Sequence, residues 1–225
     1  MALSRPRTHA AAVALCIAIA GWPSAAGAVV REPGQRVNSV AAPNCTKKGA
    51  TTIAANRRVR VFMVGKGFGN VYGCRRDADR AYVLGVRGEC QNYDEIDDAV
   101  VAGNLVALNI QTCGLTSTSS RLRLVSLLSG RVLFGSAPLT TRPVGEAQYD
   151  AIRRMVVTAE GRLAWVGVRV ERGAVVAAEV RRRAHGSRAG TVLLEGDARI
   201  DPRSLRRRGN TASWSTEGAT RSARI

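Results

Sequence analysis

Aromatic side chains, histidine and long apolar runs are all scarce in this chain of 225 residues. Aromatic residues make up only 4 % of the sequence, so few rings are available for stacking on nucleic-acid bases. No apolar run reaches the roughly 20 residues that a membrane-spanning helix requires. The G-x-S-x-G motif of serine hydrolases is absent as well. The sequence therefore disfavours a helical membrane protein, a hydrolase of that class and a single-strand nucleic-acid binder.

The first 28 residues have the layout of a secretory signal peptide. An arginine-containing start precedes the 11-residue apolar segment Ala10–Ala20, and Ala26 and Ala28 are the small residues that a signal peptidase reads. The apolar segment is too short to cross a bilayer as a helix. We expect cleavage after Ala28, which leaves a secreted or envelope-associated chain of 197 residues with a net charge of +15.

The remaining chain is expected to form one domain after a short leader. Apolar residues account for 45 % of the sequence, enough for a folded core rather than a disordered chain. Residues 29–44 contain two prolines and show no hydrophobic period, which predicts a leader or linker. The domain itself is expected to span residues 45–225.

Four cysteines, Cys45, Cys74, Cys90 and Cys113, remain after signal removal. An even number in an exported chain predicts two disulfides, whereas the absence of a C-x-x-C pair argues against a structural zinc site. Three connectivities are possible. We favour Cys45–Cys74 with Cys90–Cys113, because each bridge then closes a local loop.

Strand signatures dominate the domain. No proline interrupts residues 45–137, which suits paired strands, and Arg58–Val61 and Arg121–Leu124 alternate polar and apolar residues with period two. Two segments are ambiguous. Glu146–Met155 is compatible with a short helix, whereas we expect a strand at Ala174–Arg183, because Arg172-Gly173 before it is typical of a turn.

A weak internal repeat organises these strands. Gly-Asn pairs at 69–70, 103–104 and 209–210, and Glu160-Gly161 in the equivalent place, each precede a strand-like run and suit hairpin turns. The pattern predicts an all-β, propeller-like array of about four antiparallel meanders. The last unit, Ile200–Ile225, holds three strands, and we expect Thr51–Asn56 to complete it and close the ring. A β-sandwich or an open barrel with the same turns is the alternative.

Several short motifs resemble those of a known group of proteins. The run Ile200–Leu205, the Gly209-Asn210 turn with Trp214, and the Arg221–Arg224 ending are similar to the close of a group of uncharacterised exported proteins from high-GC actinobacteria. Val71–Cys74 and Thr112–Gly114 resemble their cysteine segments. The resemblance covers most of the mature chain. It implies a β-propeller-like fold and no particular activity, so no catalytic residue follows from it.

Candidate catalytic groups are few. His185 is the single histidine of the mature chain, which excludes two-histidine metal sites, and its arginine-rich turn predicts a solvated loop residue. The glycines of Gly65–Gly69 lack the P-loop spacing, so we expect a hairpin tip. The acidic cluster Asp94–Asp98 is interpreted as a solvated loop that pairs with arginines, with a calcium site or the paired carboxylates of a glycosidase as alternatives. We expect no catalytic residue, no resident metal and no cofactor.

Positive charge is the remaining signal. Arginine outnumbers lysine 31 to 3, and composition bias of a GC-rich genome explains much of this excess. Within the triplets at 181–183 and 206–208, Arg181 and Arg183 would share one face of a strand, and so would Arg206 and Arg208. Such pairs suit phosphate or carboxylate groups through bidentate hydrogen bonds.

The sequence therefore predicts an exported, non-enzymatic binding or scaffold module that acts as a monomer and engages an anionic cell-envelope polymer or a protein partner. Nucleic acid is disfavoured as the partner, because export removes the chain from cytoplasmic DNA. The alternative function is a carbohydrate hydrolase or lyase that uses carboxylates near Asp94–Asp98 on a propeller-like scaffold.

Overall fold

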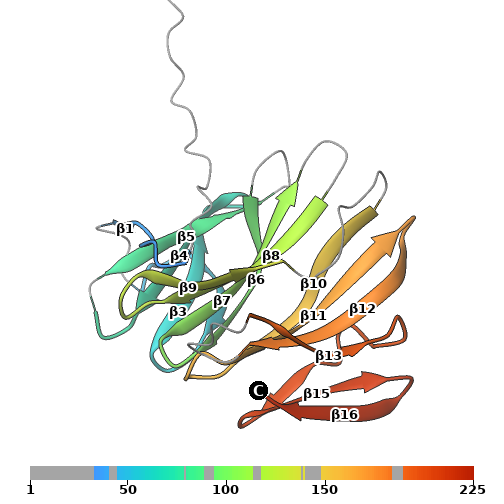
Figure 1. Cartoon of the computed structure of the whole chain (residues 1–225). Coiled ribbons are helices and arrows are strands. Elements are labelled where there is room, and N and C mark those ends of the chain that lie inside the picture. Colours follow the sequence, from blue (N-terminus) through green and yellow to red (C-terminus); the bar gives the residue numbers. More distant parts are fainter. Residues whose placement is uncertain are drawn as a thin grey trace, which may run out of the picture.

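The structure is a computed structural model that describes residues 33–40, 45–78, 80–88, 94–113, 118–137, 139, 148–183 and 190–225. All regular structure within these residues is β-strand, which confirms the all-β class (Figure 1). One sheet contains 13 strands, and a second sheet contains three. The signal-peptide prediction, Cys90 and His185 lie outside the described residues.

The large sheet is built from three successive antiparallel meanders of four strands each. The first meander consists of β2 (Thr51–Ala55), β3 (Val59–Val64), β4 (Gly69–Arg75) and β5 (Ala81–Arg87). The second consists of β6 (Asp94–Ala102), β7 (Leu105–Cys113), β8 (Thr118–Ser126) and β9 (Arg131–Ser136). The third consists of β10 (Gln148–Val157), β11 (Leu163–Glu171), β12 (Ala174–Arg183) and β13 (Val192–Gly196).

The C-terminal sheet, the name used below for the three-stranded sheet, follows the third meander. It consists of β14 (Arg206–Arg208), β15 (Thr211–Thr216) and β16 (Ala219–Arg224). Figure 1 shows it beside β13. The last unit therefore has three strands, as the sequence predicts.

Short parallel contacts join the meanders into one sheet. Val86 of β5 pairs with Glu95 of β6, and Ser119 of β8 pairs with Asp150 of β10. A closed ring of separate sheets is not seen in the described chain. The expected role of residues 51–56 is wrong, because β2 pairs with β3 instead of completing the C-terminal unit. A short hairpin with β3 costs less loop-closure entropy than pairing with the far end of the chain.

The three large meanders share the positions of their β-bulges. The first strand of each carries one extra residue against the second strand, at Ile53, Asp97 and Arg153. The fourth strand of each carries one against the third strand. In all three cases that extra residue is leucine, namely Leu84, Leu133 and Leu194. The repeat inferred from the turns is therefore also present in the backbone.

Most of the expected turns are present. The Gly103-Asn104, Glu160-Gly161 and Gly209-Asn210 pairs each lie between consecutive paired strands. Gly69-Asn70 is an exception, because both residues belong to β4. The preceding glycine-rich segment forms the hairpin tip instead, where Gly65 and Gly67 adopt positive φ angles of 132° and 72°.

The two ambiguous segments are both strands. Ala174–Arg183 coincides with β12, as predicted. The helix considered at 146–155 is wrong, because β10 begins at Gln148 and pairs with β11 along its length. Ile152 and Met155 are buried in the core, so tertiary pairing outweighs the local helix propensity.

Apolar clusters lie between neighbouring meanders. One cluster joins the first two meanders, and a second, which contains the fully buried Trp165, joins the second meander to the third. A third cluster joins the third meander to the C-terminal sheet, where Leu205 and Trp214 pack inward. Trp214 is 5 % exposed, so the C-terminal sheet packs into the core through this side chain.

A disulfide links Cys45 to Cys74, with their Cα atoms 5.7 Å apart. It encloses a sequence separation of 29 residues, which corresponds to roughly 3–4 kcal/mol of stabilisation through the unfolded chain. This half of the expected pairing agrees with the sequence-based choice. The Cys113 side chain, like Cys90, lies outside the described residues, so the second bridge stays a prediction.

Part of the segment assigned to the leader packs on the domain. β1 (Ser39–Val40) pairs with β5, and the main-chain amides of Gly34 and Val37 donate hydrogen bonds to the Val132 and Gly130 carbonyls near β9. Val37 is 5 % exposed. Within the described residues no helix is long and apolar enough to cross a membrane.

Candidate functional site

The C-terminal sheet presents an arginine-bearing surface. Directly paired residues of an antiparallel sheet lie on the same face. Arg206 pairs with Ser213, and Arg208 and Arg224 both pair with Thr211. The outer face is the name used here for the surface that these residues form with three further hydroxyl side chains. Those three residues are Ser215, Thr220 and Ser222.

The opposite face of the same sheet points into the core. Ala212 and Trp214 of β15 are buried, and they alternate along the strand with the residues of the outer face. This alternation leaves Arg206, Arg208 and Arg224 exposed. The sequence-based expectation that Arg206 and Arg208 share a face therefore agrees with the register.

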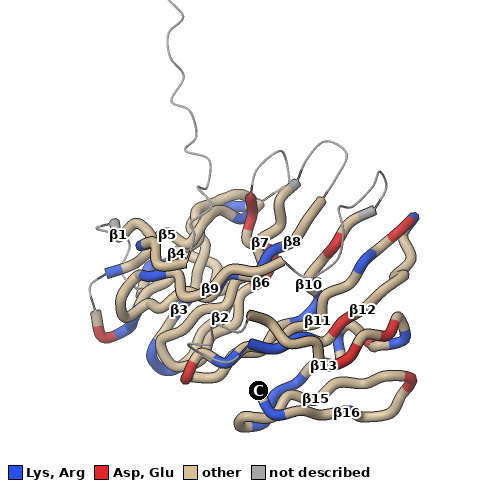
Figure 2. The backbone as a smooth tube through the Cα atoms, viewed as in Figure 1, with Lys and Arg blue, Asp and Glu red and all other residues tan. Residues whose placement is uncertain are grey.

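The charge of the C-terminal sheet is predominantly positive. From position 202 to the last residue the chain has six arginines and one acidic residue, Glu217. Glu217 is engaged by the Arg199 guanidinium at 2.5 Å. The Nη1 atom of Arg206 donates to the Arg203 and Leu205 carbonyls, at 2.6 and 3.0 Å, which orients that guanidinium. Figure 2 shows how widely basic residues are distributed over the rest of the chain.

The other predicted arginine pair does not form an exposed site. Arg181 is 3 % exposed, and its Nε atom donates to the Glu179 carboxylate at 2.6 Å. The Arg183 guanidinium lies 4.3 Å from the centre of the Phe134 ring. Both arginines lie on β12, which pairs with β11 along one edge and with β13 along the other. Glu179, two residues before Arg181 on the same face, is the sequence signal that predicts this internal ion pair.

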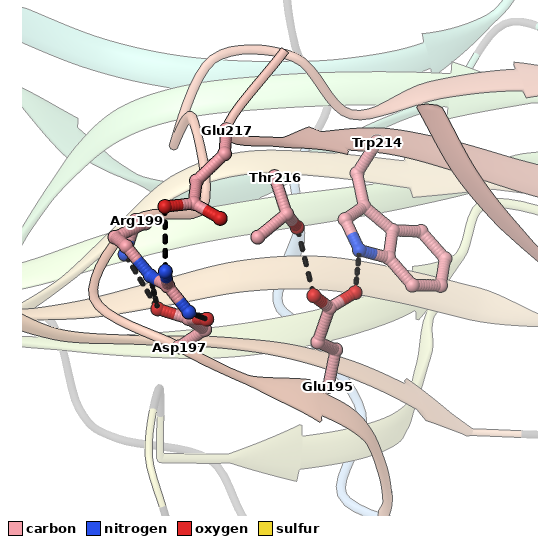
Figure 3. A network of polar contacts seen from close by, with 6 residues as sticks. All are labelled: Glu195, Asp197, Arg199, Trp214, Thr216 and Glu217. Atoms are coloured by element: carbon pink, nitrogen blue, oxygen red, sulfur yellow. Dashed lines mark hydrogen bonds and ion pairs between the residues drawn. The ribbon is translucent and has the colours of Figure 1, made fainter. Parts of the chain in front are cut away.

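A polar network fixes the C-terminal sheet to the large sheet (Figure 3). The Glu195 carboxylate on β13 accepts hydrogen bonds from the Trp214 indole at 2.5 Å and from the Thr216 hydroxyl at 2.8 Å. Beside it, Arg199 bridges Asp197 and Glu217. The hydrogen bonds from Arg199 lower the pKa of Asp197 to about 2, so this ion pair persists into acidic solution. The network therefore holds the outer face in a fixed orientation.

The acidic cluster predicted at 94–98 is divided among three environments. Asp94 accepts a hydrogen bond from the Thr112 hydroxyl at 2.5 Å and forms an ion pair with Arg121. Glu95 is buried at the junction of β5 and β6. Asp97 and Asp98 line a surface hollow. The expected solvated loop is wrong, because these residues begin β6 and Glu95 is buried. Among the described residues, the expected pairing with arginine is seen for Asp94.

Glu95 is the member of this cluster that is buried without full hydrogen bonding. Its side chain is 8 % exposed, and its Oε2 atom has no hydrogen-bond partner among the described residues. Burial raises the pKa of the Glu95 carboxyl, and the nearby Asp97 charge acts in the same direction. A hydrogen bond from the Gly88 main chain opposes both effects.

Replacing Glu95 by glutamine is expected to stabilise the protein at neutral and alkaline pH. The protonated Glu95 contributes stability below the ordinary pKa of 4.5, and this contribution is lost as the pH rises through the higher folded-state pKa. Glu95→Gln cannot ionise, so its free energy of unfolding should exceed that of the wild type by about 1 kcal/mol at pH 8 and match it at pH 4. Urea denaturation at the two pH values measures both. An equal difference at both pH values would contradict the argument.

The hollow beside Asp97 has a volume of about 260 Å³. It lies over β6, β7 and β10, and its surface is mostly polar. Its lining residues are Asp97, Asp98, Asn109, Ile152, Arg153, Arg154 and Met155. Asn109 was not singled out from the sequence, because a single asparagine within an apolar strand carries no motif.

No group of three histidine, cysteine or acidic side chains suited to a metal ion occurs within the described ranges. The calcium alternative for residues 94–98 therefore has no ligand cluster there to support it. In comparisons with known proteins, no model of a protein family and no curated protein matches this chain.

Proposed function

We propose that the chain is an exported, monomeric binding module, and that the outer face of the C-terminal sheet holds an anionic polymer of the cell envelope. The observation that carries the proposal is the grouping of Arg206, Arg208 and Arg224 on one face among hydroxyl side chains, with no acidic residue on that face. Guanidinium groups bind phosphate and carboxylate oxygens bidentately, and the hydroxyls supply further donors and acceptors.

The spacing of these arginines suits a repeating polyanion. Arg206 and Arg208 are two residues apart on one strand, which corresponds to roughly 7 Å. Arg224 lies two strands across from Arg208, which corresponds to roughly 10 Å. A face with charges at these intervals is able to contact several repeats of one polymer, whereas a single small anion would use one arginine.

The location and the finer architecture are part of the same proposal. The signal-like segment at residues 1–28 and the Cys45–Cys74 disulfide support export to an oxidising compartment. The shared bulges, together with contacts of β6 with both β2 and β10, support a propeller-like arrangement in which the first strands of the meanders are neighbours. The same features are compatible with the proposed relation to exported actinobacterial proteins.

The triple variant Arg206→Gln/Arg208→Gln/Arg224→Gln is expected to lose binding to cell-wall preparations by at least about tenfold at low salt. Because such binding releases counterions, wild-type retention should fall steeply as sodium chloride is added. Co-sedimentation of the purified chain with an insoluble wall preparation over a salt series measures both effects.

A matched control separates the outer face from net charge. Arg57→Gln/Arg80→Gln/Arg172→Gln removes three charges from exposed connections between strands of the large sheet. This control should keep most of the retention. Equal losses in both triple variants, or salt-independent retention, would overturn the proposal. Competition by duplex DNA that is stronger than competition by wall polymer would assign the face to nucleic acid instead.

Carbohydrate cleavage is a second candidate function, because Asp97 and Asp98 line one hollow, as an acid and base pair would. Release of reducing ends from wall polysaccharide, lost in Asp97→Asn and Asp98→Asn, would favour it. Retention on walls without any such release favours the binding function.

A further inference from the structure

Asn109 departs from the pattern of the three meanders. In each meander one residue of the second strand pairs with the residue that follows the bulge of the first strand. In the first and third meanders these residues are Val61 and Val166, and both are fully buried. In the second meander the same place is taken by Asn109, which is 2 % exposed. A buried amide in place of a valine costs stability unless all its polar atoms are satisfied.

The amide of Asn109 is only half satisfied. Its Nδ2 atom donates to the Asp97 carboxylate at 2.9 Å and to the Ile152 carbonyl at 3.0 Å. These two hydrogen bonds fix the orientation of the side-chain amide, because both use Nδ2, and they leave Oδ1 as its acceptor atom. That Oδ1 atom has no hydrogen-bond partner among the described residues, although Asn109 lines the hollow. The Oδ1 atom itself has almost no solvent-accessible area, and a buried acceptor without a partner beside a cavity costs stability that a ligand donor would recover.

Two bulges complete the hollow. Asp97 is the extra residue of β6, and Arg153 is the extra residue of β10, so both side chains are redirected relative to a regular strand. Asp97, Asp98, Arg153 and Arg154 together supply two negative and two positive charges. The hollow is therefore neutral overall, and it offers both acceptors and donors.

We propose that this hollow binds one neutral hydroxylated ring of monosaccharide size. Each hydroxyl both donates and accepts, so one ring is able to donate to Asn109 Oδ1 and Asp97 and to accept from the neighbouring arginines. A strongly charged ligand would meet a like charge on one wall. A volume of about 260 Å³ admits a single ring but is smaller than the pockets of larger ligands. The site uses none of the residues of the outer face, so it goes beyond the proposed polymer binding.

Nuclear magnetic resonance of the ¹⁵N-labelled chain tests the site directly. D-Glucose, D-galactose, D-mannose and N-acetyl-D-glucosamine are titrated separately at millimolar concentrations. At least one is expected to shift the side-chain amide signals of Asn109 and the backbone signals of Asp97 and Arg153 in a saturable way. Four sugars that all leave these signals unchanged would overturn the proposal.

Two variants and one control sharpen the test. Asn109→Val introduces the residue found at the equivalent places of the other meanders, and it should weaken the sugar that binds by about tenfold. Asp97→Asn alters an exposed side chain, so it should fold even if Asn109→Val does not, and it should also weaken binding severalfold. Asp77→Asn, in the turn after β4, makes the same chemical change elsewhere and should bind as the wild type does.

The two proposals fail independently. Unchanged sugar affinity in both Asn109→Val and Asp97→Asn would show that the hollow is not the site, while wall retention through the outer face would be unaffected. Loss of wall retention in the arginine triple variant with sugar shifts intact would leave the hollow as the binding site for the ring. Carbohydrate cleavage at Asp97 and Asp98 would fall together with the hollow.

Discussion

Replacing Trp165 by alanine is expected to lower the free energy of unfolding by about 4 kcal/mol. Trp165 is fully buried on β11 in the cluster that joins the second and third meanders, and its ring lies 6.2 Å from that of Phe134. Alanine leaves a cavity that the paired strands on both sides cannot close, because their spacing is fixed by hydrogen bonds. Urea denaturation followed by circular dichroism measures the loss.

Trp165→Phe serves as the matched variant, because it keeps an aromatic ring and removes less volume. Its loss should be well under that of Trp165→Ala. Losses of equal size in the two variants would mean that the indole makes a specific contact that packing does not explain. A loss below about 1 kcal/mol in Trp165→Ala would contradict the assignment of this residue to the core between the meanders.

Removing Asp150 is the second change with a large expected effect, a loss of about 3 kcal/mol for Asp150→Ala. Asp150 is 7 % exposed at the parallel contact with Ser119, and its carboxylate accepts two hydrogen bonds from Arg169, at 2.9 and 3.2 Å. These hydrogen bonds raise the pKa of Arg169, so alanine leaves a charged guanidinium largely buried without its main partner.

A double variant separates the cost of an unpaired charge from the worth of the pair. Asp150→Leu/Arg169→Met replaces both charges with apolar groups, and it should recover most of the stability lost in Asp150→Ala. Denaturant midpoints of the three proteins, taken at one pH, give the comparison. A double variant as unstable as Asp150→Ala would show that the pair itself holds the junction.

The two junctions between meanders use buried acids in opposite ways. Asp150 is engaged by Arg169, whereas Glu95, at the other parallel contact, has an oxygen without a partner among the described residues and a raised pKa. The same substitution of an acid by a neutral side chain is therefore expected to destabilise one junction and to stabilise the other. Whether the carboxylate is fully hydrogen-bonded decides the sign of the change in stability, since both side chains are buried to a similar extent.

Local patterns in the sequence predict the strands and their hairpins. Alternation at Arg121–Leu124 and turn pairs such as Gly103-Asn104 act over a few residues, so they can be recognised without knowledge of the rest of the chain. The joining of meanders depends on single parallel contacts at Val86 and Ser119, between strands whose order no local signal specifies. For this reason the sequence predicts the units but not their assembly into one sheet.

The candidate sites were predictable to different degrees. Arg206 and Arg208 follow from two-residue periodicity, and the register extends their face to Arg224. Arg181 shows the limit of that argument, because its guanidinium pairs with Glu179, two residues away on the same face, and is not free for an external anion. Asn109 could not be predicted as a site residue from the sequence. It stands out only against the two valines at the same place in the other meanders, and the strand registers are needed to identify them.

The common bulge positions bear on the history of the chain. Three consecutive segments carry an additional residue at corresponding points of their first and fourth strands, although their turn lengths and most side chains differ. Insertions that arose separately would not be expected to coincide six times. Tandem copying of one ancestral segment that already contained both irregularities explains them most simply. On that account, Asn109 in the middle copy and the valines in the other two are alternatives at one position of a shared backbone plan.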